Sequence, residues 1–191
     1  RVVGGEFRGR KLQVPDRGVR PTSERVREAI FDMLGPAWTA GAAVLDLYAG
    51  TGALGIEALS RGAARADFVE RDAAVAKLLR DNLAALGLAE RARVVIADLD
   101  REALPAELRG PWSLVFLDPP YAGEGGTRWL ARLASLAWAA EGGLAVYEHR
   151  SGSTVPPPPG LALAVERAYG DTAVSIYRAG GPPAAAERGA S

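Results

Sequence analysis

Asp46-Leu47-Tyr48-Ala49-Gly50-Thr51-Gly52-Ala53-Leu54-Gly55 is the stretch that decides the fold, because it joins a short apolar run to a helical segment through a glycine-rich turn. Gly50, Gly52 and Gly55 satisfy the pattern G-x-G-x-x-G. Glycines at this spacing allow a sharp turn and a close approach of the backbone to a nucleoside, with a helix N-terminus behind it. Dinucleotide enzymes and some tight turns share the pattern, so it predicts a strand–turn–helix unit and leaves the ligand open.

Short apolar runs alternate with helical stretches on both sides of this turn. We expect strands over 43–48, 66–70, 93–98, 113–118 and 144–149, helices over 54–61, 73–86 and 127–140, and a closing antiparallel hairpin over 161–168 and 172–178. Gly62 and Gly87 stand where helix C-terminal caps belong. Most of the runs are apolar on both faces, as in parallel strands covered by helices. The alternation predicts an α/β fold with a doubly wound, mostly parallel sheet.

The N-terminal residues form a separate predicted unit in front of this core. Residues 2–5 and 11–14 flank a glycine-rich charged stretch, which predicts a short β-ribbon. Pro21 is expected to open a helix with Thr22 or Ser23 near its cap, and Gly35-Pro36 to end it. We expect a single domain over 1–179, with ribbon and helix in 1–35 and the core in 43–178. Residues 180–191 are rich in Pro, Gly and Ala and are expected to be a disordered tail.

The composition narrows the chemistry that the 191 residues can perform. The chain has no cysteine and one histidine, His149, so a disulfide framework, a thiolate zinc site and a cysteine nucleophile are excluded. No apolar segment is long enough for a membrane span and no leader is evident, so we expect a soluble, untargeted protein. The net charge is zero, but residues 1–27 contain eight basic and three acidic groups. This excess suits either a contact with phosphate or a solvated charged face.

Three acidic residues end three successive predicted strands. Asp46 precedes the first glycine of the turn by four residues, where its charge would repel a pyrophosphate. S-adenosylmethionine has no phosphate and carries an ammonium and a sulfonium, so a carboxylate suits it. Glu70 is placed for ribose hydroxyls and Asp98 for an adenine amino group. Each acid alone could be a strand-end or capping residue, but together they favour S-adenosylmethionine as cofactor.

Leu117-Asp118-Pro119-Pro120-Tyr121 ends the fourth predicted strand. Two prolines hold a stiff extended turn without backbone donors, and a plain strand stop is the alternative interpretation. An exocyclic amine of a base is a poor nucleophile because its lone pair is delocalised. The Asp118 carboxylate and the Pro119 carbonyl can accept hydrogen bonds from such an amine, and Tyr121 can stack on an extracted base. The motif therefore predicts methyl transfer to a base amine through positioning, without a metal.

The motif and the glycine turn together resemble the Asn/Asp/Ser-Pro-Pro-Tyr/Phe class of amino-methyltransferases with the Rossmann-like S-adenosylmethionine-dependent methyltransferase fold. Residues 1–12, 20–28 and 49–62 more narrowly resemble the bacterial small-subunit rRNA guanine-N2 methyltransferase family (RsmD-like). The similarity covers roughly residues 1–178. The first two blocks are its specific part, because adenine and cytosine enzymes share the Asp-Pro-Pro-Tyr motif.

The resemblance implies methylation of one guanine N2 in 16S rRNA, on the small ribosomal subunit or its assembly intermediate. The lack of cysteine and of a long apolar segment leads us to expect a cytoplasmic protein that binds no membrane, and a monomer, since nothing in the sequence demands an oligomer. The resemblance also implies that Asp118, Pro119 and Tyr121 are catalytic. The implied cofactor residues are Asp46, Tyr48, Ala49, Gly50, Thr51, Gly52, Glu70, Arg71, Asp98, Leu99 and Asp118. The implied RNA contacts are Arg8, Arg10 and Lys11 on phosphates, with Arg20 and Thr22 closing over the cofactor or the base.

Three other functions stay open at this stage. The nearest is an adenine-N6 or cytosine-N4 methyltransferase acting on DNA or RNA. A nucleotide-binding oxidoreductase would use the same glycine turn, although Asp46 argues against it, and an RNA-binding assembly factor would keep the fold without catalysis. His149 is interpreted as an ordinary strand-end residue, and Trp112, Trp129 and Trp138 as core residues.

Overall fold

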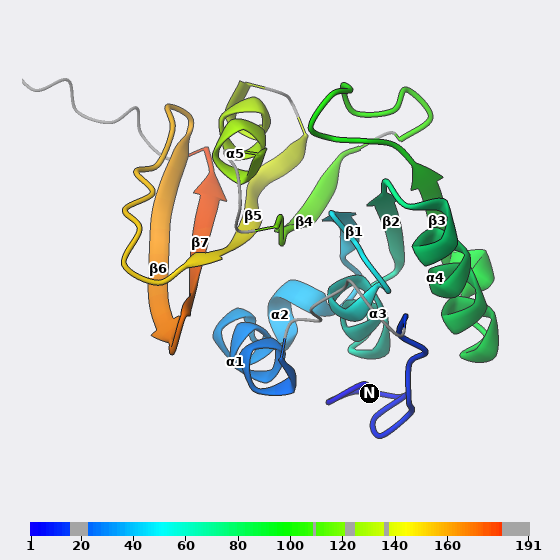
Figure 1. Ribbon diagram of the computed structural model, residues 1–191. Coiled ribbons are helices and arrows are strands. Elements are labelled where there is room, and N and C mark those ends of the chain that lie inside the picture. The colour runs from blue at the N-terminus through cyan, green and yellow to red at the C-terminus, as the bar shows by residue number, and fades with distance from the viewer. Residues whose placement is uncertain (16–22, 109, 121–124, 136–137, 181–191) are drawn as a thin grey trace, which may run out of the picture.

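The computed structural model describes residues 1–15, 23–108, 110–120, 125–135 and 138–180, which form a seven-stranded sheet with helices on both faces (Figure 1). The strands are β1 (Ala43–Leu47), β2 (Arg65–Glu70), β3 (Ala92–Ile96), β4 (Trp112–Leu117), β5 (Ala139–Arg150), β6 (Leu161–Tyr169) and β7 (Thr172–Ala179). The helices are α1 (Glu24–Leu34), α2 (Pro36–Thr39), α3 (Ala53–Ser60), α4 (Ala73–Ala85) and α5 (Gly125–Ser135), with a 3-10 turn η1 at Ala89–Arg91.

The sheet has the order β3-β2-β1-β4-β5-β7-β6. The first five of these strands are parallel, and β7 pairs antiparallel with both β5 and β6. The chain moves outward from β1 to β3 and then returns to the other side of β1 with β4. Ligands of such sheets bind beyond the carboxyl ends of the strands at this reversal. The predicted doubly wound fold with an antiparallel terminal hairpin is confirmed.

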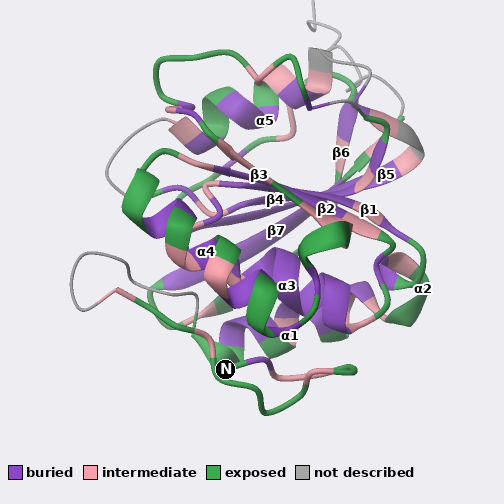
Figure 2. Ribbon diagram, turned by 90° about the vertical axis from the view of Figure 1, so that its right-hand side faces the viewer, coloured by how far each residue is buried: buried purple, intermediate pink, exposed green. Residues whose placement is uncertain are grey.

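Alternation along the central strands sends side chains into two apolar layers. Val44, Phe68 and Phe116 pack with α1, α3 and α4 on one face of the sheet. Leu45 and Leu117 face the other layer, which α5 covers. Figure 2 shows α1 and α3 on one side of the sheet and α5 on the other. Among the helices that the structure describes, none has the length and apolar character needed to cross a bilayer.

Most predicted elements lie within two residues of the observed ones, and the helix ends follow local chemistry. Ser23 caps α1, because its hydroxyl accepts a hydrogen bond from the Val26 N–H at 3.2 Å. Gly62 and Gly87 follow α3 and α4 with φ of 100° and 70°, the left-handed backbone that favours glycine there. Pro21, Thr22 and the residues of the expected tail from 181 on lie outside the described residues.

Two expectations of local structure are wrong. The helix expected over 127–140 ends at Ser135, and β5 begins at Ala139, which pairs with Trp112 of β4. Pairing with a buried neighbouring strand overrides the helix preference of this alanine-rich stretch. The β-ribbon expected over 2–14 is also absent, since residues 1–15 contain turns and bends and no strand.

The N-terminal segment folds back on itself through backbone hydrogen bonds and also binds α3. The Val2 N–H donates to the Arg10 carbonyl, and the Gly9 N–H to the Val2 carbonyl, each at 2.9 Å. The next amides donate to the α3 side chain of Glu57, from Val3 at 2.8 Å and from Gly4 at 2.7 Å. Because helix side chains satisfy these donors, no second strand forms opposite them.

Glu57 is the centre of this contact. Its side chain is fully buried, accepts a further hydrogen bond from Arg61 Nε at 2.8 Å, and lies 3.5 Å from Arg27 Nε of α1. Arg27 is 3% exposed and donates to the Arg1 carbonyl. The carboxylate therefore joins the N-terminal segment, α1 and α3.

Candidate active site

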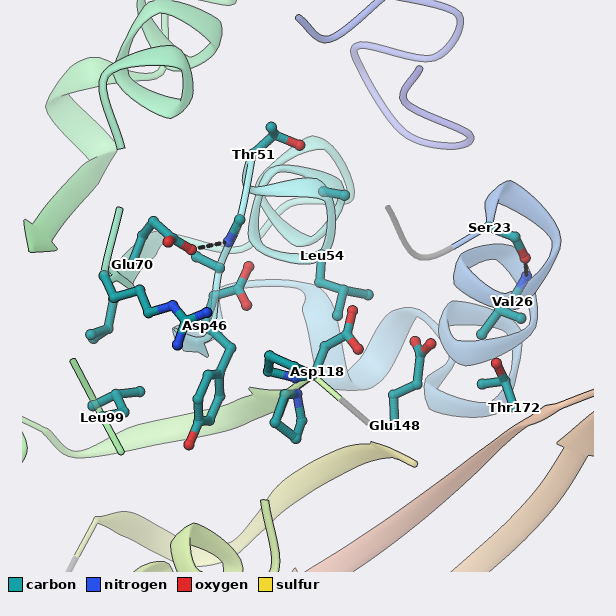
Figure 3. Close-up of a pocket in the computed structure, with 18 of the residues that line it drawn as sticks. Ser23, Val26, Asp46, Thr51, Leu54, Glu70, Leu99, Asp118, Glu148 and Thr172 are labelled. Carbon is teal, nitrogen blue, oxygen red and sulfur yellow. Dashed lines mark hydrogen bonds between the residues drawn. The ribbon is translucent and has the colours of Figure 1, made fainter. Parts of the chain in front are cut away.

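A cavity of about 630 Å³ lies beyond the carboxyl ends of β1, β2, β4 and β5 (Figure 3). Its volume falls in the range of small-molecule sites. Its lining residues come from α1, the glycine turn, the strand ends and the β6–β7 turn: Ser23, Val26, Asp46, Tyr48, Ala49, Gly50, Thr51, Ala53, Leu54, Val69, Glu70, Arg71, Ala97, Leu99, Asp118, Pro119, Pro120, Glu148, Tyr169, Gly170, Asp171 and Thr172.

The glycine turn adopts the conformation that its sequence predicts. Gly50 and Gly52 have φ of 54° and 82°, and Gly52 caps α3. Tyr48 also has a positive φ, 63°, which is uncommon for a residue with a side chain and marks a constrained position. A Cβ on Gly55 would lie 2.2 Å from a ring carbon of Phe68, so only glycine lets α3 pack this closely on the sheet.

Asp46 lines the cavity and also holds the start of α3 through a hydrogen bond. Its side chain is 1% exposed, and Oδ2 accepts a hydrogen bond from the Gly55 N–H at 2.9 Å, in the first turn of α3. Burial raises the pKa of this carboxyl well above its ordinary value, against the effect of the Gly55 hydrogen bond, and the charges of Asp118 and Glu70 raise it further. A cation placed in the cavity would favour the ionised form.

Glu70 closes one end of the cavity at the end of β2. Its Oε2 accepts from the Gly50 N–H at 2.9 Å and its Oε1 from the Asp72 N–H at 2.8 Å. Each oxygen keeps a lone pair that can accept from a hydroxyl group. Arg71 follows it, 3.8 Å from Asp100 Oδ2, and the Tyr48 hydroxyl donates to Asp100 Oδ1 at 3.4 Å.

Asp98 is placed differently from the other strand-end acids. β3 ends at Ile96, and the buried side chains of Ala97 and Leu99 line the cavity on either side of Asp98. The Asp98 carboxylate accepts from the Asp100 N–H at 3.1 Å and lies 3.5 Å from Arg101 Nε, so it holds the turn after the strand. Asp98 is not among the lining residues, and its contact with an adenine amino group stays a prediction.

The catalytic motif lies where the chain leaves β4. Asp118, Pro119 and Pro120 line the cavity directly beyond the switch between β1 and β4. Figure 3 shows the Asp118 side chain between Asp46 and Glu70 on one side and Glu148 and Thr172 on the other. Tyr121, Arg20 and Thr22, which we predicted to act at this site, lie outside the described residues.

The basic residues expected to contact RNA are exposed on the N-terminal segment. Arg8, Arg10 and Lys11 are all exposed, and Arg10 donates a hydrogen bond to the Ala85 carbonyl at the end of α4, at 3.2 Å. They do not line the cavity. Their role as phosphate contacts stays a prediction.

Sequence reasoning passed over Glu148, which lies at the end of β5 in the cavity wall and is 6% exposed. The sequence does contain a signal for it, because Glu148 is the second-last residue of the strand predicted over 144–149, and other acids near predicted strand ends line the cavity. The neighbouring His149 is turned away from the cavity and bonds to the hydroxyl groups of Ser175 and Ser153, at 2.8 and 3.1 Å. Trp112, Trp129 and Trp138 are buried core residues, as expected.

Comparisons with known proteins agree with this geometry. The model of a family described as "Conserved hypothetical protein 95" matches residues 1–178. The "Ribosomal RNA small subunit methyltransferase D" of Escherichia coli (strain K12) is 40% identical over 180 residues, covering 93% of this chain and 89% of that protein. The protein of the same name from Haemophilus influenzae is 33% identical over 180 residues, covering 93% of each.

Solved structures show the same fold. A hypothetical protein of Thermus thermophilus superposes with a TM-score of 0.75 at 33% identity, over 92% of this chain and 97% of that one. An RNA methyltransferase from Salinibacter ruber, solved with S-adenosyl-L-homocysteine, gives a TM-score of 0.60 at 18% identity, over 84% and 94% of the two chains. At that identity the second comparison supports the fold alone.

Proposed function

This chain belongs to the family described as Conserved hypothetical protein 95, and from that membership we propose that it transfers a methyl group from S-adenosylmethionine to the exocyclic N2 amine of a guanine in small-subunit rRNA. The names of the Escherichia coli and Haemophilus influenzae relatives support small-subunit rRNA as the substrate. The choice of guanine N2 rests on the resemblance of residues 1–12 and 20–28 to the guanine-N2 family.

The observation that carries the proposal is the position of Asp118-Pro119-Pro120 in the wall of the cavity beside the glycine turn. This arrangement brings a carboxylate and a rigid proline carbonyl next to a site for a nucleoside cofactor. Acceptors of this kind suit a neutral amine that must present its lone pair in one direction.

The residues of the cavity fit S-adenosylmethionine. The two Glu70 oxygens suit the ribose hydroxyls, and the apolar side chains of Val69, Ala97 and Leu99 suit the faces of adenine. Asp46 lies near the turn, where an ammonium or a sulfonium would favour its ionised form and a pyrophosphate would not. This cofactor supplies an electrophilic methyl group on a sulfonium.

The chain contributes orientation and proton acceptance. The Asp118 carboxylate and the Pro119 carbonyl accept the two N–H bonds of the target amine, which directs the nitrogen lone pair toward the methyl group. Positioning of two reactants in this way accounts for a large part of the rate enhancement of such enzymes. A methylated amine must lose a proton, and the Asp118 carboxylate, which would accept a hydrogen bond from it, would take that proton.

The alternative is an adenine-N6 or cytosine-N4 methyltransferase, because those amines suit the same motif. Incubation of the protein with labelled S-adenosylmethionine and unmodified small subunits, followed by digestion to nucleosides, separates the two. We expect label in N2-methylguanosine. Label in methyladenosine or methylcytidine would retain the mechanism and reject the proposed base.

A matched variant tests the mechanism itself. We expect Asp118→Asn to lose methylation activity by about 10²- to 10⁴-fold at saturating S-adenosylmethionine, the usual size of acid–base and positioning effects. Unchanged methylation would refute the role of Asp118. Binding of NAD in place of S-adenosylmethionine would favour an oxidoreductase, and binding without methylation of any RNA would favour an assembly factor.

We further propose that Arg8, Arg10 and Lys11 hold RNA phosphates, and that the chain acts as a cytoplasmic monomer on the small subunit or its assembly intermediate. Phosphate contacts make affinity fall steeply as salt rises. Neutralising the three residues together should weaken RNA binding and flatten its salt dependence. Unchanged affinity would remove them from the interface.

A further inference from the structure

The order of strands divides the cavity into two halves. From one side of the sheet to the other, the acids of the strands and strand ends that line it are Glu70 (β2), Asp46 (β1), Asp118 (after β4) and Glu148 (β5). Asp118 therefore lies between a half with the glycine turn and a half that β5 and β7 form. Figure 3 shows the same order, with Glu148, Thr172, Ser23 and Val26 beyond Asp118. A fifth acid in the lining, Asp171, is exposed on the turn between β6 and β7.

The first half has the residues that fit the cofactor, so the second half remains for the base. The antiparallel direction of β7 brings its first residue, Thr172, and the turn Tyr169–Thr172 to the same edge as the carboxyl ends of the parallel strands. Val26 of α1 and Leu54 of α3 provide apolar surface there.

Glu148 is the charged side chain nearest to Asp118 along the sheet in this half. β4 and β5 pair in parallel with Leu117 opposite Tyr147, so the next residues, Asp118 and Glu148, follow side by side. Neighbouring strands are separated by about 4.8 Å, and residues at matching positions face the same side of a sheet. Two neighbouring strands thus bring Asp118 and the buried Glu148 to the space proposed for the target amine, while Asp171 lies on an exposed turn.

The three candidate bases differ in the hydrogen-bonding group beside the amine, and this decides which of them a second carboxylate can bind. Beside its N2 amine, guanine has a ring N1–H, which is a donor. Adenine has a ring acceptor, N1, beside its N6 amine, and cytosine has the acceptor N3 beside its N4 amine. An ionised carboxylate accepts only, so it attracts the guanine edge and repels the other two.

We propose that Glu148 accepts a hydrogen bond from the N1–H of the target base while Asp118 holds the neighbouring N2 amine, and that Glu148 thereby selects guanine. This inference rests on the proposed function and assigns its base specificity to one residue. The two oxygens of a carboxylate offer about four acceptor positions, so Glu148 can bind the base while keeping its contacts within the protein. Burial of Glu148, at 6% exposure, strengthens both the attraction and the repulsion.

The test begins with the wild-type protein, which identifies the methylated nucleoside and its position in the small subunit. Label in methyladenosine or methylcytidine at this step overturns the proposed function together with this inference. With N2-methylguanosine as product, subunits are then reconstituted with 2-aminopurine at that position. This base keeps the N2 amine but has a ring acceptor where guanine has N1–H.

We expect the wild-type protein to prefer guanine to 2-aminopurine by about 10- to 100-fold in kcat/KM, the usual effect of one good base-edge contact. Glu148→Gln should lose guanine activity by a similar factor and lose or reverse this preference, because its amide group can donate to the ring acceptor. Affinity for S-adenosylmethionine should stay unchanged in Glu148→Gln. Glu90→Gln, on the exposed η1 turn, serves as the matched control and should behave as the wild type.

A structural role for Glu148 would lower activity on both bases by the same factor, and that outcome would overturn the inference while leaving the proposed function intact. If Glu148→Gln does not fold, Glu148→Asp provides the second test. It retains the carboxylate and should retain the preference for guanine at reduced activity. A Glu148→Asp protein that methylates 2-aminopurine as well as guanine would also overturn the inference.

Discussion

Replacement of Glu57 by Gln should destabilise the protein severely without touching the cavity. Glu57 is fully buried and accepts hydrogen bonds from Val3, Gly4 and Arg61, with Arg27 as a buried ionic partner. Glutamine has the same shape, but in either orientation its amide nitrogen faces donors, and Arg27 loses its counter-charge. Breaking one partner of a buried pair costs about 3–5 kcal/mol.

Urea denaturation, monitored by circular dichroism, measures this loss in the free energy of unfolding. For a chain of this size the same loss lowers the melting temperature by about 6–20 °C. Asp81→Asn is the control, because its pair with Lys77 on α4 is exposed and such pairs contribute at most about 1 kcal/mol. If Glu57→Gln costs no more than Asp81→Asn, the reasoning about the buried cluster is wrong.

Three further predictions concern the cofactor half of the cavity. Gly55→Ala places a Cβ 2.2 Å from Phe68, so it should cost about 1–3 kcal/mol in urea denaturation and weaken cofactor binding; full stability would refute the packing argument. Burial raises the pKa of Asp46, so between about pH 4 and that raised pKa the folded protein binds more protons than the unfolded chain. The free energy of unfolding of the cofactor-free protein should therefore fall as pH rises from about 4 toward the raised pKa. Asp46→Asn should remove this dependence of stability on pH. In the wild type, calorimetry in buffers of different ionisation enthalpy should also detect a proton released from Asp46 when the cofactor binds, and Asp46→Asn should lose that release. Glu70→Gln should weaken cofactor binding by about 10- to 100-fold, since an NH2 donor replaces one of the two oxygens that accept from Gly50, Asp72 and the proposed ribose hydroxyls. An unchanged dissociation constant in a titration would contradict that role.

The positions of the strands and of the glycine turn are predictable from sequence because they depend on strong local signals. Apolar runs flanked by glycine-capped helices locate β1, β2 and β4 to within two residues. The spacing of Gly50, Gly52 and Gly55 locates the turn, and the structure gives each glycine a reason, in backbone angle or in close packing.

The side on which a strand-end residue points is harder to predict, because side chains alternate and one residue decides the outcome. Sequence reasoning considered His149, whereas its neighbour Glu148 faces the cavity. Asp98 follows β3 by two residues and holds a turn. These details depend on where each strand ends, which is set by pairing with its neighbours.

Hydrogen-bond and strand-pairing partners that are distant in the sequence are also hard to predict from it. The N-terminal segment has the turn residues of a β-ribbon, but its amides find Glu57 more than fifty residues further along. The alanine-rich stretch after α5 likewise joins β4. In both cases tertiary contacts override a sound local preference.

The turn between β6 and β7 can change in sequence and length without disturbing the sheet. Its two exposed residues, Gly170 and Asp171, line the half of the cavity that we propose for the base, together with the strand ends Tyr169 and Thr172. The half proposed for the methyl donor is lined by the ends of β1 and β2 and the turns that follow them. Surface turns accept substitution and changes of length far more readily than buried strands do. Changes in this turn, in evolution or by grafting it from a relative, can therefore alter which RNA site is methylated while the residues proposed to bind the methyl donor stay the same.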